Sequence, residues 1–163
     1  MPSTVPMHGE IFIYSAPKHS GKTSALLKWS ARKNDVFGML TPDISGVRYF
    51  FDVGTGRSFQ MEAAEDESAV IAVGKYRFSK SAFDRAIDIL RDIPLQQSGW
   101  LIIDEAGPLE LQGKGFSGII FHILSDATRS IRVILVVREE LTEKICAHFQ
   151  IAQWERFDPL TIK

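Results

Sequence analysis

The stretch IFIYSAPKHSGKTSALLKW, residues 11–29, decides the fold of this chain. Residues 11–14 are β-branched or aromatic, which is typical of a buried strand. Residues 15–21 contain proline, serine and glycine and predict a loop. From Lys22 onward, apolar residues recur at helical spacing and predict a helix. A buried strand that leads through a short loop into a helix is typical of α/β proteins with a parallel sheet.

The rest of the chain continues this alternation. The apolar runs at residues 100–103 and 133–137 predict two more buried strands, and residues 154–157 predict a final one. Residues 107–118 are rich in glycine, and we expect them to be irregular. Helices are predicted from an N-cap at Ser81 to a stop at Pro94, around residues 119–124, and over residues 139–149.

A β-hairpin is predicted where residues 47–53 and 57–61 flank Gly54-Thr55-Gly56. The other strands are continuous apolar runs, which indicates a sheet that helices cover on both faces. We therefore predict a three-layer α/β fold with a mainly parallel sheet and an inserted hairpin.

Length and charge restrict the classes of protein to consider. The chain has 163 residues, and we expect a single domain over 1–163 with residues 1–9 as a loose tail. Its 45% hydrophobic content is enough for a core and argues against disorder. Lys and Arg number 19 against 20 Asp and Glu, a net charge of −1, so we do not expect nucleic acid as a partner.

The compartment is predicted from cysteine use and from apolar runs. Cys146 is the only cysteine, so an intramolecular disulfide is excluded. No apolar run approaches the roughly 20 residues that span a bilayer, and residues 1–6 lack the features of a secretory signal. The sequence therefore predicts a cytoplasmic protein with no membrane contact.

The loop after the first strand has the pattern of a phosphate-binding loop. Residues 16–23 match G-x-x-x-x-G-K-[ST], except that Ala16 replaces the first glycine. In such a P-loop, backbone N–H groups point at the phosphates, the lysine (Lys22) neutralises their charge, and the hydroxyl (Thr23) binds Mg²⁺. Lys18 and His19 lie at the predicted loop tip, where solvent exposure is the alternative to phosphate contact. The predicted nucleotide-binding residues are Ala16, Pro17, Lys18, His19, Ser20, Gly21, Lys22, Thr23 and Ser24.

The strand at residues 100–103 runs directly into two carboxylates, Asp104 and Glu105. In P-loop enzymes an aspartate at this point lies beside the magnesium that Thr23 would bind, and a following glutamate can orient or deprotonate the attacking water. This layout is typical of the water-activating, RecA/ASCE-like division of P-loop proteins. The alternative is a strand that stops at a charged turn. The guanine-reading N-K-x-D signature is absent, so the choice between ATP and GTP stays open.

Arg138 follows the third buried strand directly. Ligands of parallel α/β sheets bind at the carboxyl ends of the strands, so a guanidinium there could stabilise charge on the γ-phosphate. The alternative is a surface arginine paired with Glu139 or Glu140.

Four stretches resemble the THEP1-type nucleoside-triphosphatase family. They are residues 20–23, residues 41–52 with Thr41-Pro42-Asp43 and Gly46-Val47-Arg48, residues 73–76 (VGKY) and residues 104–111 (DEAGPLEL). The resemblance implies slow, Mg²⁺-dependent hydrolysis of ATP, GTP and other nucleoside triphosphates. The chain departs from the family pattern at Ala16, Phe50, Pro108 and residues 136–138, which bears on rate and base preference.

Two alternatives remain open from the sequence. The loop at residues 18–23 is also similar to that of molybdopterin-guanine-dinucleotide accessory proteins, so a small-molecule kinase or a cofactor-maturation accessory protein is possible. A kinase usually needs an arginine-rich lid, and the sequence has no arginine cluster. The second alternative is a nucleotide-binding module with little turnover. No protein partner follows from the sequence, although residues 107–118 are where we would expect one to be sensed.

Overall fold

The computed structural model describes residues 9–163, and residues 1–8 of the predicted tail lie outside them. The prediction of a loose tail is wrong for Gly9. Its backbone N–H donates to the carbonyl of Arg129 at 2.9 Å, and its own carbonyl accepts from the Arg129 guanidinium at 2.7 Å. The first described residue is thus tied to the turn before the third buried strand.

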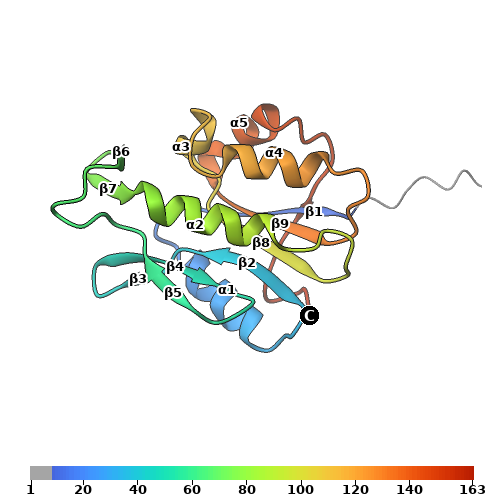
Figure 1. Ribbon diagram of the computed structural model, residues 1–163. Helices are drawn as coiled ribbons and strands as arrows, with labels where there is room; N and C mark the ends of the chain where they lie inside the picture. The colour runs from blue at the N-terminus through green and yellow to red at the C-terminus, as the bar shows by residue number, and fades with distance from the viewer. Residues whose placement is uncertain (1–8) are drawn as a thin grey trace, which may run out of the picture.

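The centre of the molecule is a parallel sheet (Figure 1). β1 pairs in parallel with β10 and β9, β9 with β8, and β8 with β2. The predicted strands are confirmed, while β2 had no strand prediction. The strands run, in sheet order, over Glu155–Arg156 (β10), Ile11–Ala16 (β1), Arg132–Arg138 (β9), Trp100–Asp104 (β8) and Val36–Leu40 (β2).

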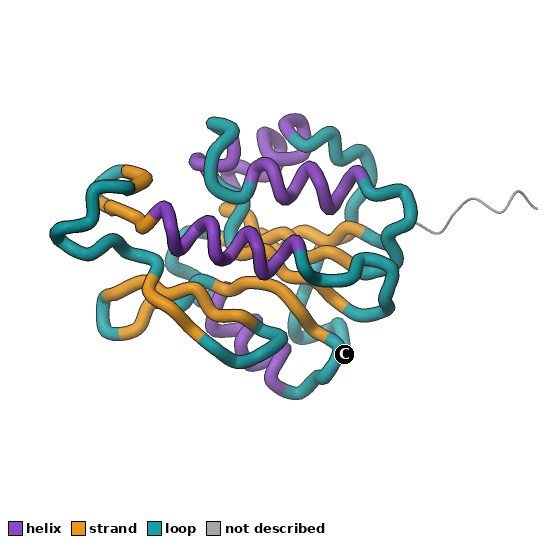
Figure 2. The backbone as a smooth tube through the Cα atoms, in the orientation of Figure 1, coloured by secondary structure: helices purple, strands orange, loops and turns teal. Residues whose placement is uncertain are grey.

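The predicted hairpin is confirmed and extends this sheet. β4 (Val47–Asp52) pairs antiparallel with β2, β5 (Ser58–Gln60) and β3 (Asp43–Ile44). A second hairpin, β6 (Val70–Val73) and β7 (Tyr76–Ser79), forms a separate two-stranded sheet. Figure 2 shows this second hairpin at one end of the molecule, away from the main sheet.

Helices cover both faces of the sheet, as predicted. α1 (Lys22–Ala31) packs below it in Figure 1, and the other long helices pack above it. A hydrophobic core lies on each face of the sheet, and successive residues of β8 point into alternate cores. Ile102 packs with Leu26 and Trp29 of α1, whereas its neighbours in the strand face the opposite layer. The helices of that layer are α2 (Lys80–Arg91), α3 (Pro108–Leu111), α4 (Ser117–Ser125) and α5 (Thr142–His148).

Three helix predictions need correction. The N-cap of α2 is Ser79, whose hydroxyl accepts from the backbone N–H of Ala82 at 3.2 Å, whereas the Ser81 hydroxyl bonds to that of Ser79. The segment at 107–118 is not wholly irregular, because it contains α3 and the first two residues of α4. The helix predicted over 139–149 is a 3₁₀ turn, Glu139–Leu141, followed by α5.

None of the helices between residues 9 and 163 has the length and apolar character that crossing a bilayer requires.

Candidate functional site

The three central strands bring the predicted site residues to one edge of the sheet. Ala16 at the end of β1 is in register with Arg138 at the end of β9, and Asp104 at the end of β8 is in register with Val136. Because these strands are parallel, their following loops leave from the same edge. A cleft of about 530 Å³ lies there. Its lining includes Lys18, His19, Ser20, Gly21, Lys22, Thr23, Ser24, Thr41, Arg48, Tyr76, Asp104, Glu105 and Arg138.

The predicted phosphate-binding loop has the backbone that its sequence requires. Gly21 is the N-cap of α1 and has φ of +83°, in the left-handed region that glycine favours. A Cβ at Gly21 would meet no protein atom within 4 Å, so within the described chain its conformation is what requires glycine. The Lys22 ammonium is buried and donates to the carbonyls of Ala16 at 3.0 Å and Pro17 at 3.1 Å. Ala16 and Pro17 thus hold the lysine and do not line the cleft.

Thr23 and Asp104 meet at the base of the cleft. The Thr23 hydroxyl donates to Asp104 Oδ2 at 2.7 Å, and the backbone N–H of Thr41 donates to the same oxygen at 3.1 Å. Asp104 is only 2% exposed, and burial raises its pKa, while the hydrogen bond from Thr23 acts to lower it. A hydroxyl and a carboxylate at this distance form the oxygen donor set that Mg²⁺ prefers.

Glu105 and Arg138 face each other across the cleft. Arg138 Nη2 lies 3.5 Å from Glu105 Oε1, and both side chains are about three-quarters buried. Burial raises the pKa of Glu105, the neighbouring Asp104 raises it further, and Arg138 counteracts both. Arg138 therefore points into the site, and its ion-pair partner among residues 9–163 is Glu105 instead of Glu139 or Glu140.

Arg48 is a residue of this site to which the sequence analysis assigned no role. It lies on β4, lines the cleft, and has its guanidinium carbon 5.5 Å from the ring centre of Tyr76. Its Nε is buried and has no hydrogen-bond partner among the described residues. The available signal was an arginine within the apolar strand pattern of residues 47–53. Arg48 also acts to lower the pKa of both Asp104 and Glu105.

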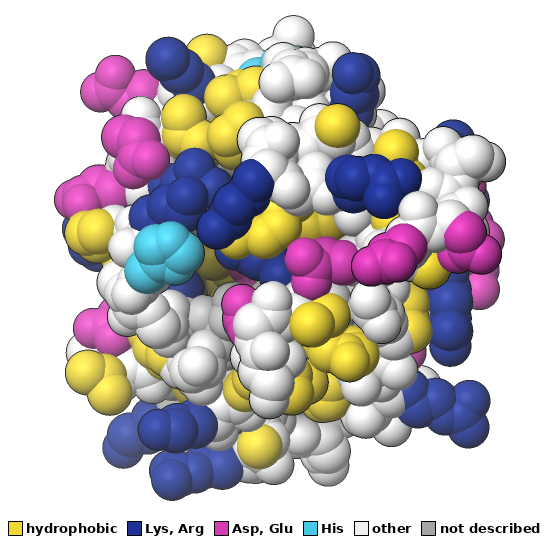
Figure 3. Space-filling model, turned by 90° about the vertical axis from the view of Figure 1, so that its left-hand side faces the viewer, with side chains coloured by type: hydrophobic (Ala, Val, Ile, Leu, Met, Phe, Trp, Pro, Cys, Tyr) yellow, Lys and Arg dark blue, Asp and Glu magenta, His cyan; other side chains and the backbone are white. Residues whose placement is uncertain are grey.

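A mixed cluster of lysines and arginines, which no single stretch of the sequence shows, forms in three dimensions. Lys18, Lys22, Arg48 and Arg138 come from three distant segments and line one cleft. Figure 3 shows Lys and Arg side chains gathered beside a hollow on this face of the molecule. Four cations around two buried carboxylates give the cleft the charge that a polyphosphate needs.

This chain is similar to known proteins in sequence and in fold. Residues 10–157 match a family model described as NTPase. The nucleoside-triphosphatase THEP1 of Korarchaeum cryptofilum (strain OPF8) is 31% identical over 160 residues, and the match covers 92% of this chain and 80% of that protein. This chain belongs to the THEP1-type nucleoside-triphosphatase family. The resemblance inferred from four short stretches is thereby confirmed.

A solved THEP1 structure confirms the fold class. The crystal structure of THEP1 from the hyperthermophile Aquifex aeolicus superposes with a TM-score of 0.70 at 18% identity, covering 91% of this chain and 88% of that one. The predicted three-layer α/β fold with a mainly parallel sheet is therefore that of a THEP1-type protein. All four stretches of the resemblance also contribute to the cleft, through residues 20–23, Arg48, Tyr76 and residues 104–105.

Proposed function

We propose that this protein hydrolyses nucleoside triphosphates, ATP and GTP among them, to the diphosphate and inorganic phosphate in a slow, Mg²⁺-dependent reaction. The observation that carries the proposal is the 2.7 Å contact between Thr23 and Asp104 at the foot of the P-loop, with Glu105 next in the chain. In this arrangement one residue pair would hold a metal, and the adjacent carboxylate would act on water once its ion pair with Arg138 loosens.

Phosphate binding falls to the loop from Ala16 to Ser24. Its backbone N–H groups and the N-terminus of α1 would hold the triphosphate, because both present partial positive charge to an anion. The Lys22 ammonium has three N–H donors, so it would keep its bonds to Ala16 and Pro17 and donate the third to a phosphate oxygen. The burial of Lys22 and its two hydrogen bonds hold the ammonium within the loop.

Thr23 and Asp104 would hold the magnesium ion. Their oxygens fit Mg²⁺ by chemistry, and the buried carboxylate of Asp104 has both of its described donors on one oxygen, Oδ2. When bound, the ion neutralises charge on the phosphates.

Glu105 is the proposed general base. Its carboxylate would accept a proton from the attacking water, a role that requires it to be ionised. Arg138 supports that state, since it acts to lower the pKa of Glu105. Its guanidinium would also contact the γ-phosphate. The ion pair has to loosen before Glu105 can turn to a water, which favours slow turnover.

Phosphate release from a panel of nucleoside triphosphates, with and without Mg²⁺, tests the proposal. We expect release to be lost in Lys22→Ala and reduced about 10²- to 10⁴-fold in Glu105→Gln. The matched controls are Lys28→Ala, an exposed lysine of the same helix, and Glu139→Gln, an exposed glutamate. Full activity in both test variants would contradict the proposal. Tight nucleotide binding without phosphate release would select the binding module instead.

We further propose that the chain forms one domain and lies in the cytoplasm. The first and last strands, β1 and β10, pair with each other, so both described ends belong to one sheet. The single cysteine, Cys146, is a free thiol, which suits a reducing compartment.

A further inference from the structure

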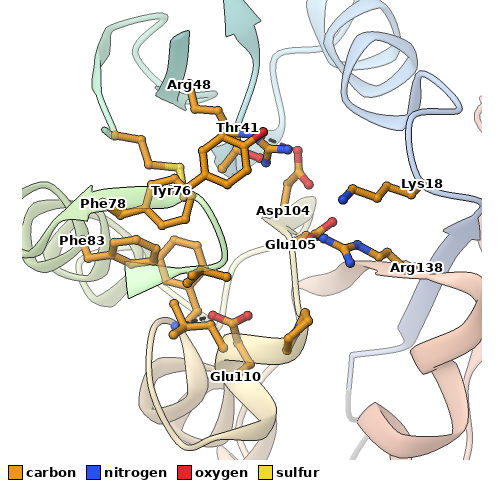
Figure 4. Close-up of a pocket in the computed structure, with 15 residues that line it drawn as sticks. Lys18, Thr41, Arg48, Tyr76, Phe78, Phe83, Asp104, Glu105, Glu110 and Arg138 are labelled. Atoms are coloured by element: carbon orange, nitrogen blue, oxygen red, sulfur yellow. Dashed lines mark hydrogen bonds and ion pairs between the residues drawn. The ribbon is translucent and has the colours of Figure 1, made fainter. Parts of the chain in front are cut away.

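A second cavity opens from the cleft beside Glu105 (Figure 4). Its volume is about 80 Å³, several times the roughly 10–15 Å³ that one water needs by the same kind of measure. It shares Lys18, Thr41, Arg48, Tyr76, Asp104, Glu105 and Arg138 with the cleft, so the two spaces are continuous. A molecule in this cavity would therefore lie against the residues that we assign to hydrolysis.

One wall of this cavity is aromatic. Tyr76 and Phe78 of β7 stack at 5.5 Å with a 7° angle between their rings, and Phe78 lies 6.1 Å from Phe83 of α2. Phe116, which precedes α4, continues the wall at 5.5 Å from Phe83. Met61 and Val73 also contribute to the apolar lining. We call this cavity the aromatic pocket.

The opposite wall is charged. Figure 4 shows Glu105, Arg138 and Lys18 across the cavity from the aromatic side chains, with Arg48 at one edge. Glu110 lies at the floor, but its two oxygens already accept backbone N–H groups from Gly107 and Phe116, both at 2.9 Å. The groups left for a ligand are therefore the rings on one side and the catalytic residues on the other.

Hydrolysis alone does not account for this pocket. Water needs no aromatic wall, whereas a flat ring gains free energy by leaving water and packing on aromatic faces. The volume of about 80 Å³ suits one small ring. A short polar arm on such a ring would reach Glu105, since that carboxylate lines both spaces.

We propose that the aromatic pocket binds a small aromatic alcohol, one planar ring with a hydroxyl on a short arm, and that this hydroxyl accepts the γ-phosphoryl group in place of water. The inference goes beyond hydrolysis and rests on the triphosphate site proposed above. The hydroxyl oxygen forms a bond to the γ-phosphorus. At the same time, the bond breaks between that phosphorus and the oxygen that bridges it to the β-phosphorus. The electron pair leaves with the nucleoside diphosphate, and Glu105 accepts the hydroxyl proton, so the products are a phosphate monoester and the diphosphate.

The arginines support transfer as well as hydrolysis. A kinase needs cations around the transferred phosphoryl group, and Arg48 and Arg138 line both the cleft and the aromatic pocket. A ring seated on Tyr76 and Phe83 would also displace water from beside Glu105, which favours transfer to the alcohol over hydrolysis.

The test uses the full chain with benzyl alcohol and 3-pyridinemethanol as ring alcohols and glycerol as the alcohol without a ring. Binding is followed by saturation-transfer NMR, and the products of Mg²⁺–ATP reactions are followed by ³¹P NMR. The blocking variant is Val73→Phe, because Val73 lines the pocket and not the cleft. The matched control is Ala72→Phe, on the exposed opposite face of the same strand.

We expect the ring alcohols to bind and to yield their phosphate esters, and glycerol to do neither. Val73→Phe should weaken ring-alcohol binding at least about tenfold, because the new ring occupies the buried apolar space, while Ala72→Phe should not. Affinity for a non-hydrolysable ATP analogue and the thermal midpoint check that each variant is folded. If Val73→Phe fails to fold, Met61→Trp replaces it, since Met61 also lines only the pocket.

Three results would overturn the inference. They are absence of saturation transfer to every ring alcohol, binding that yields inorganic phosphate and no ester, and a Val73→Phe variant whose only defect is a raised KM for ATP. The last result would show that the pocket holds part of the nucleotide. Phosphate release without any alcohol reports on the proposed hydrolysis separately, so the two proposals can fail independently.

Discussion

Thr23 and Asp104 are 81 positions apart in the chain, yet the Thr23 hydroxyl donates a 2.7 Å hydrogen bond to Asp104 Oδ2. The contact spans β1–α1 and β8, two segments separated in the sheet by β9. Each side chain is held by its surroundings. Thr23 lies in the first turn of α1, and Asp104 accepts the backbone N–H of Thr41. The pair is thus held in place by contacts within the protein.

Removing the charge of Asp104 should weaken metal binding. Asp104→Asn keeps the size of the side chain but replaces a charged oxygen ligand with an amide. We expect the Mg²⁺ concentration for half-maximal phosphate release to rise at least about tenfold. A Mg²⁺ titration of phosphate release measures this. Thr23→Ser, which keeps the hydroxyl, should restore most of the affinity that Thr23→Ala loses. An unchanged Mg²⁺ dependence in both Asp104→Asn and Thr23→Ala would show that the metal binds elsewhere.

Replacing Arg138 should change the pH dependence of hydrolysis. Burial raises the pKa of Glu105, and Arg138 counteracts the rise, so Arg138→Gln should move this pKa upward. Because the base acts in its ionised form, the acid limb of kcat/KM should move to higher pH. The variant should therefore lose more activity at pH 6 than at pH 8. Arg156→Gln, at an exposed arginine of β10, is the control. An equal loss at every pH would indicate that Arg138 contacts phosphate without affecting Glu105.

Arg48 should contribute to the rate although the sequence analysis gave it no role. Its guanidinium lines the cleft beside Asp104 and Glu105, and its buried Nε has no partner among residues 9–163. We expect Arg48→Gln to lower kcat at least about tenfold through loss of charge stabilisation. Arg57→Gln, at an exposed arginine of the same hairpin, should have little effect. Steady-state kinetics of the two variants measure this effect. Equal kcat values would show that Arg48 does not contribute to the rate.

The sequence predicted the central strands well for a physical reason. β8 and β9 are buried on both faces, so they appear as unbroken apolar runs. β2 was missed because Gly38 interrupts its apolar pattern, and glycine usually weakens a strand. The structure explains this glycine: its φ is +123°, and a Cβ there would collide with the carbonyl of Ile102 in β8.

The site residues likewise fall into those that could be predicted from the sequence and those that could not. Thr23, Asp104 and Glu105 could be predicted from the sequence. Thr23 lies within a recognisable motif, and the two carboxylates directly follow a predicted buried strand. Arg48 could not be placed, since nothing in the local sequence indicates that β4 returns to the edge of the sheet where β1 ends. The aromatic pocket was hidden for the same reason, because β7, α2 and the segment before α4 each supply part of it.

The corrected N-cap of α2 makes a simple stability test. Ser79 accepts the backbone N–H of Ala82, so Ser79→Ala should lower the free energy of unfolding by about 1 kcal/mol. Ser81→Ala, which removes a contact to the Ser79 hydroxyl and no cap, should cost clearly less. Urea unfolding of both variants at one pH compares them directly. A larger loss of unfolding free energy in Ser81→Ala would indicate that Ser81 is the N-cap.

The buried carboxyl of Glu110 should make folding stability depend on pH. Burial raises its pKa from 4.5 to about 7, against the opposing hydrogen bonds from the backbone N–H groups of Phe116 and Gly107. The folded protein thus binds this proton more tightly than the unfolded chain does. The resulting stabilisation is complete below about pH 4.5 and is lost as the pH rises through about 7, and it amounts to roughly 3 kcal/mol at most.

Glu110→Gln isolates this contribution. The glutamine cannot titrate, and it leaves one of the two backbone N–H groups without an acceptor, which costs about 1–3 kcal/mol. The stability advantage of the wild type over this variant should therefore shrink between pH 5 and pH 8. Urea unfolding across that range measures it, with Glu140→Gln as the exposed control. A difference that stays constant with pH would mean that Glu110 keeps an ordinary pKa, because its two N–H donors would then outweigh its burial.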